Sequence, residues 1–82
     1  MLYLHRTKLA LENLGMTVIA GTEESGRESL NATIETKRGP FTVFAIAEGA
    51  RLEKPNGTSK YLYGCTDGKL SAVVRQTIKA NS

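Results

Sequence analysis

The sequence is poor in the residues that most often carry chemistry. Its 82 residues include one cysteine, one histidine and no tryptophan. Cys65 therefore has no partner for an internal disulfide. A single imidazole without a thiol or carboxylate at ligand spacing indicates neither a metal site nor a catalytic dyad at His5. We interpret Cys65 as a buried structural thiol and His5 as an ordinary surface or half-buried residue.

The sequence also has no long apolar run. No segment approaches the ~20 apolar residues that a membrane-spanning helix needs. Arg6, Lys8 and Glu12 interrupt the N-terminal segment, where a signal peptide requires an apolar stretch. No glycine-rich phosphate-binding motif occurs. We therefore expect a cytoplasmic protein that is not an enzyme, has no membrane association, and binds neither a cofactor nor a metal ion.

The composition is that of one small folded domain. Hydrophobic residues make up 40% of the chain and charged residues 23%, a balance that favours a folded chain over a disordered one. Eighty-two residues suffice for a single core, so we expect one domain over residues 1–82. The net charge of +3 is uneven, because residues 1–36 have three Lys or Arg against five Glu. The basic character belongs to the second half.

Hydrophobic periodicity predicts a helix at each end of the chain. Apolar and small residues recur at spacings of three and four near the N-terminus, until Gly15 ends the pattern. The C-terminal helix is expected over residues 69–79, with Asp67 available as its N-cap. Its predicted buried stripe consists of Leu70, Val73, Val74 and Ile78.

The region between the helices predicts four or five antiparallel strands. A β-branched run at 16–20 and an alternating segment at 30–35 flank residues 21–29, which we predict to be an exposed polar loop. Residues 41–47 are largely apolar on both faces, so this strand is expected to be central and covered on both sides. The Asn56-Gly57 pair predicts a hairpin with a type I′ turn. The expected fold class is α+β, with two layers: an antiparallel sheet of four to five strands, and an N-terminal and a C-terminal helix that flank it.

The strand at 41–47 raises a geometric difficulty. If both helices lie on one side of the sheet, either Phe41 and Val43 or Phe44 and Ile46 stay uncovered. Such an apolar patch favours a protein partner or a second copy of the chain. The alternative is that the helices split and cover both faces of the sheet.

A partner on that patch would meet tyrosines with a basic rim. Tyr61 and Tyr63 share one face of their strand and would enlarge the patch. The predicted partner-binding residues are Tyr61, Tyr63, Lys60, Lys54 and Arg51. We expect a small non-enzymatic protein-interaction module, for example a stoichiometric inhibitor or adaptor carried by a phage or another mobile element.

Nucleic-acid binding is the alternative function. The basic second half could place its cations on one face that follows a phosphate backbone, with the two tyrosines as stacking platforms. The residues that would carry this function are Lys37, Arg38, Lys54, Lys60, Lys69 and Lys79.

Overall fold

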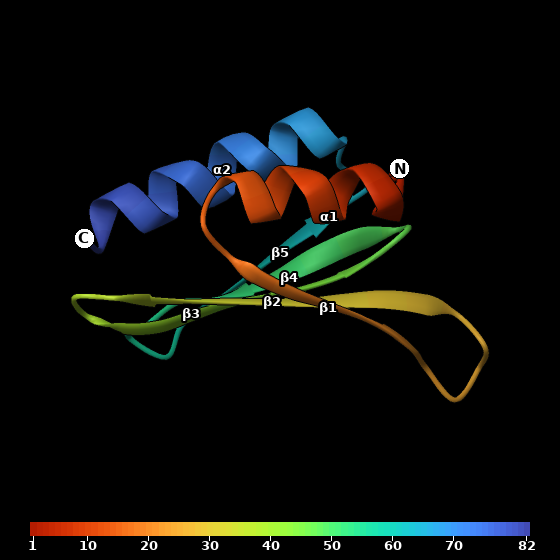
Figure 1. The fold of residues 1–82 in the computed structure, drawn as a ribbon, viewed down its shortest axis with the longest axis horizontal. Coiled ribbons are helices and arrows are strands. Elements are labelled where there is room, and N and C mark those ends of the chain that lie inside the picture. Colours follow the sequence, from red (N-terminus) through yellow and green to blue (C-terminus); the bar gives the residue numbers. More distant parts are fainter.

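The computed structural model describes all 82 residues as two helices and five strands (Figure 1). In chain order these are α1 (Leu4–Asn13), β1 (Thr17–Thr22), β2 (Glu28–Thr36), β3 (Gly39–Ile46), β4 (Gly49–Glu53), β5 (Ser59–Tyr63) and α2 (Asp67–Ala80). The strands form one antiparallel sheet in sequential order. Both helices lie on the same side of it (Figure 1). The predicted two-layer α+β fold is confirmed.

The middle strand, β3, divides its side chains between the two sides of the sheet. Phe41, Val43 and Ala45 are fully buried in the core beneath the helices. Phe44 and Ile46 alternate with them and are only half-buried, on the opposite side. The predicted central position is confirmed. The expectation that the strand is covered on both sides is wrong, because neither helix crosses to the second face.

Helix α2 packs on the sheet through a narrower stripe than the sequence predicts. Leu70 and Val74 are buried in the core. Val73 and Ile78 are half-buried and pack against its margin. The prediction of full burial is therefore wrong for these two residues, since the helix presents only its innermost line of side chains to the sheet.

The start of α2 also differs from the prediction. Thr66, not Asp67, is the N-cap, and its hydroxyl accepts a hydrogen bond of 3.2 Å from the backbone N–H of Lys69. The Asp67 carboxylate instead accepts hydrogen bonds from the Thr7 hydroxyl and from the backbone N–H of Tyr3, the latter at 3.3 Å. Through these bonds the Asp67 carboxylate joins the first turn of α2 to the first turn of α1, where Thr7 is buried.

The hairpin between β4 and β5 has the predicted position but not the predicted turn. The backbone N–H of Gly57 donates to the Lys54 carbonyl at 3.0 Å, and the N–H of Lys54 donates to the Thr58 carbonyl at 2.9 Å. Gly57 has a φ of +87°, whereas no residue other than glycine has a positive φ. A type I′ turn needs positive φ at Asn56 as well, so the type I′ prediction is wrong. The pattern is a three-residue loop that closes on a left-handed glycine.

The hairpin between β1 and β2 closes in the same way. The N–H of Gly26 donates to the Glu23 carbonyl at 2.9 Å, and Gly26 has a φ of +85°. Thr22 pairs with Glu28, so the loop is limited to residues 23–27. The predicted loop at 21–29 is too long, because polar residues at its ends continue the strands.

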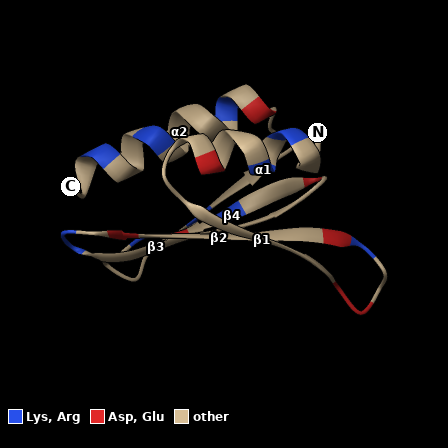
Figure 2. Ribbon diagram, in the orientation of Figure 1, with Lys and Arg blue, Asp and Glu red and all other residues tan.

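The two ends of the molecule carry different charges. In Figure 2 basic bands gather on the C-terminal half of α2 and at the turn between β2 and β3, while acidic bands gather around the turn between β1 and β2. The turns at Gly39 and Pro55 adjoin each other, since a Cβ atom built on Gly39 lies 3.6 Å from the Pro55 Cβ. Several cations of the second half therefore meet at one end of the molecule.

Candidate functional site

The candidate site lies on the side of the sheet that the helices leave open. Strand register places Phe44, Arg51 and Tyr61 in one cross-strand row. The neighbouring row contains Ile46, Gly49 and Tyr63. We call these six residues the tyrosine face. It spans β3, β4 and β5, and side chains opposite one another on adjacent strands are close enough to form one surface.

The two tyrosines form the outer wall of this surface. Tyr61 and Tyr63 are two residues apart on β5, so both point to the open side. Their rings are nearly parallel, with an interplanar angle of 6° and centroids 6.0 Å apart. The exposed fractions are 54% for Tyr61 and 82% for Tyr63. Stacking holds each ring in a defined position while most of its area remains available to a partner.

Gly49 forms the floor of a hollow between Ile46 and Tyr63. The hollow has a volume of about 200 Å³ and is also bordered by Phe44, Arg51 and Glu48. An enclosed cavity of ~150 Å³ can hold a benzene ring. The hollow is therefore large enough for one aromatic or branched aliphatic side chain.

Charged groups frame the hollow. The Arg51 guanidinium lies 5.6 Å from the centre of the Phe44 ring, and its Nε lies 3.4 Å from a Glu53 carboxylate oxygen. At the other end, Glu48 pairs with Arg27 at 3.4 Å. All four charged groups are partly exposed, so these pairs orient side chains more than they stabilise the fold. The surface offers aromatic rings, framed by two cations and two carboxylates.

Three of the five predicted partner-binding residues lie together. Tyr61, Tyr63 and Arg51 belong to the tyrosine face. Lys60 alternates with the tyrosines along β5 and so points to the helix side, where it shares a shallow groove with Lys54 and the end of α2. The predicted basic rim is therefore wrong for Lys54 and Lys60, because strand alternation turns Lys60 away from the open face.

The predicted nucleic-acid-binding residues are also divided. Lys54 and Lys60 line the groove beside α2 together with the side chains of Gln76 and Asn81. Lys37 and Arg38 form the turn before Gly39. Gly39 adjoins Pro55, the residue after Lys54. Lys79 is in the last turn of α2. Lys69 is in the first turn of α2, ten residues from Lys79 and therefore ~15 Å away along the helix. The expectation that all six cations share one face is wrong for Lys69.

The sequence did not single out Gly49 or Glu48. Gly49 follows a tight connection between two strands, a place where glycine is common for many reasons. Its role as the floor of a hollow depends on lying between Ile46 and Tyr63, which requires the register of three strands. Nothing local in the sequence predicts that register.

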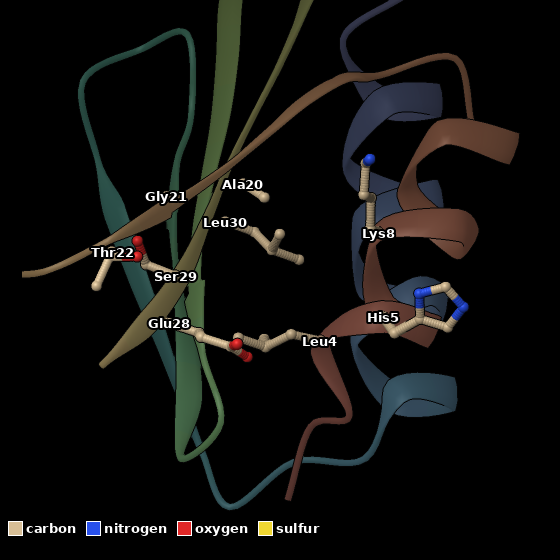
Figure 3. A pocket seen from close by; sticks show the side chains of 9 residues that line it. All are labelled: Leu4, His5, Lys8, Ala20, Gly21, Thr22, Glu28, Ser29 and Leu30. Carbon is tan, nitrogen blue, oxygen red and sulfur yellow. The ribbon is translucent and has the colours of Figure 1, made fainter. Parts of the chain in front are cut away.

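The residues with reactive side chains lie outside this surface. Cys65 is buried, with its thiol 3.8 Å from the Leu62 carbonyl, and burial raises the pKa of this thiol. His5 is exposed at the start of α1, beside a cavity of about 420 Å³ between α1 and the strands β1 and β2 (Figure 3). No three His, Cys, Asp or Glu side chains lie close enough together to hold a metal ion.

Neither helix has the length and apolar character needed to cross a membrane. The chain matches no protein-family model, no curated protein and no solved structure.

Proposed function

We propose that this protein is a small non-enzymatic interaction module that binds a protein partner through the tyrosine face. The observation that carries the proposal is an aromatic and aliphatic surface with a hollow, on a sheet face that no helix covers. Exposed apolar patches of this kind on small proteins mark interaction sites. Tyrosine and arginine, together with tryptophan, are the residues most enriched among those that dominate binding energy at interfaces.

The framing of the hollow suggests how the partner binds. A partner would insert one aromatic or branched side chain above Gly49, between Ile46 and Tyr63, while its backbone or polar groups meet Arg51 and Glu48 at the rim. A binder of this size with no chemistry of its own acts stoichiometrically, as an inhibitor or an adaptor. The free, buried Cys65 is compatible with a reducing compartment.

Capture of the partner from lysate of the native host tests this function. The tagged protein should retain one protein at a fixed molar ratio, and nuclease treatment should not release it. Combined Tyr61→Ala and Tyr63→Ala should weaken this binding by about 2 kcal/mol, roughly thirtyfold in Kd, if the tyrosines anchor the interface. Partner binding with an unchanged Kd after both substitutions would contradict the proposal.

Tyr3→Ala is the matched control. Tyr3 is exposed to 61%, close to the 54% of Tyr61, but lies at the start of α1 on the helix layer. Tyr3→Ala therefore removes an aromatic ring of comparable exposure and leaves the tyrosine face unchanged. We expect Tyr3→Ala to bind the partner like the wild type.

Nucleic-acid binding remains a second candidate, favoured by the basic end of the molecule. Lys54 and Lys60 share a groove with the end of α2, whose last turn contains Lys79. The turn that contains Lys37 and Arg38 adjoins Pro55, next to Lys54. Clustered cations of this kind attract a phosphate backbone. The tyrosines point to the other side of the sheet from Lys60, so they would not serve as stacking platforms for a strand held in that groove.

A further inference from the structure

Strand β1 is an edge strand without the features that normally prevent further pairing. It pairs with β2 from Thr17 to Thr22 without a bulge, and its other side has no neighbour. Its six residues, TVIAGT, include no charge and no proline. Edge strands of soluble proteins usually carry lysine, proline or a bulge, because their unpaired N–H and C=O groups otherwise recruit another strand. The outer side of β1 is therefore open to main-chain hydrogen bonding.

The opposite edge of the sheet differs. Strand β5 is one residue shorter than β1, and Lys60 lies within it. The loop before it contains Pro55, which has no N–H to donate. An inward or edge-positioned lysine is a usual device against strand addition. Of the two edges, β1 is the one suited to accept a strand.

The side chains of β1 fit a second copy of the same strand. Ile19 points to the open side of the sheet and is exposed to 66%. In an antiparallel pairing about a twofold axis at Ile19, each Ile19 would lie opposite the other, and Thr17 would lie opposite Gly21 of the second copy. No charged group would be buried by this pairing.

Helix α1 adds charge complementarity to the same edge. Leu4 and Lys8 line a cavity with Ala20 and Gly21, so the first half of α1 lies over the second half of β1 (Figure 3). Glu12 is one turn after Lys8 on the same side of the helix, and therefore nearer the start of β1. The twofold pairing brings the start of one β1 to the end of the other. Glu12 of each copy would then face Lys8 of the other, which favours a second copy over an unrelated strand.

We propose that two copies of this chain associate through β1 and join their sheets into one continuous sheet. The proposal rests on the β1 edge and on α1, and does not depend on the function assigned to the tyrosine face. The tyrosine face spans β3 to β5 and so lies away from the proposed contact. A dimer of this form would present two partner-binding faces at once.

Light scattering coupled to size exclusion tests the dimer at micromolar to submillimolar concentration. We expect a mass twice the 8.9 kDa of the chain at the upper end of this range. Ile19→Lys should raise the dimer Kd by roughly a hundredfold, because two lysines would face each other across the axis. Ser59→Lys places the same charge at an exposed position on the β5 edge and should leave the Kd unchanged. A thermal melt of each variant verifies that it is folded.

Charge exchange on α1 gives an independent measurement. Glu12→Lys alone should weaken the dimer, and adding Lys8→Glu should restore it, since the two opposite charges are then exchanged but still face each other. A single-chain mass at every concentration overturns the proposal. A dimer unaffected by Ile19→Lys overturns it too, as does one lost through Tyr61→Ala and Tyr63→Ala. If monomeric Ile19→Lys still captures the partner protein, a failure of the dimer proposal is distinguishable from a failure of the proposed function.

Discussion

At Gly49 a single added methyl group would act on both the fold and the tyrosine face. A Cβ atom at this position would lie 2.2 Å from the Leu62 carbonyl oxygen on the neighbouring strand. Because that neighbour is backbone, β4 and β5 would have to separate. We expect Gly49→Ala to lower the free energy of unfolding by about 2 kcal/mol, the usual cost of overpacking, and to distort the hollow. Urea denaturation measures the change.

Gly68 provides the matched glycine. It lies in α2 without a positive φ, and a Cβ atom there would meet nothing within 4 Å. Gly68→Ala should therefore stabilise the protein by about 0.5–1 kcal/mol, since alanine loses less backbone freedom in a helix. If both alanine variants change the free energy of unfolding in the same direction, the close approach of β5 to Gly49 is not the cause of the change measured for Gly49→Ala.

At the scale of the element, two adjacent residues at the start of α2, Thr66 and Asp67, have different roles, although either is a suitable N-cap by residue type. The Thr66 hydroxyl caps the helix, whereas Asp67 bonds to α1. Thr66→Ala should lower the free energy of unfolding by about 1 kcal/mol, and Thr66→Ser should retain most of the stability, because serine caps equally well. Equal stability of the alanine and serine variants would show that Thr66 is not the cap.

Most elements could be predicted from the sequence because their signals are local. Periodicity places both helices, and alternation places the strands around Leu30 and Phe41. The errors occur where tertiary contacts decide. Asp67 is a good N-cap residue by type, but its carboxylate accepts a hydrogen bond from Thr7 of α1, which is far from it in the sequence. Thr22 and Glu28 are polar enough for a loop, yet they pair across the hairpin.

The candidate site could be predicted only in part, for the same reason. Alternation along β5 is local, so the sequence predicts the shared face of Tyr61 and Tyr63. The same alternation places Lys60 on the opposite face, which the prediction of a basic rim around the tyrosines overlooked. The side of β3 that faces the helices does not, because Phe41 and Phe44 are equally apolar. Phe44 is left on the open side only because both helices pack against the other side of the sheet.

On the scale of the whole molecule, the charge distribution provides a test of the alternative function. If the basic end binds nucleic acid, Lys54→Glu with Lys60→Glu should abolish binding at low salt, and the wild-type affinity should fall steeply as salt increases. Lys69→Glu, at the other end of α2, should have a smaller effect. Fluorescence anisotropy with labelled single- and double-stranded oligonucleotides measures each affinity. No binding by the wild type at low salt would remove this candidate.

The central claim, that the tyrosine face binds a protein, is tested most directly by site-specific photo-crosslinking in host lysate. A photoreactive phenylalanine analogue replaces Tyr63, which is exposed to 82%, and in a parallel sample it replaces Tyr3. The account predicts that position 63 crosslinks to one protein, that nuclease does not remove this product, and that combined Tyr61→Ala weakens it. Position 3 should give no such product. The claim is contradicted if position 63 yields no protein crosslink, or only the products that position 3 also yields.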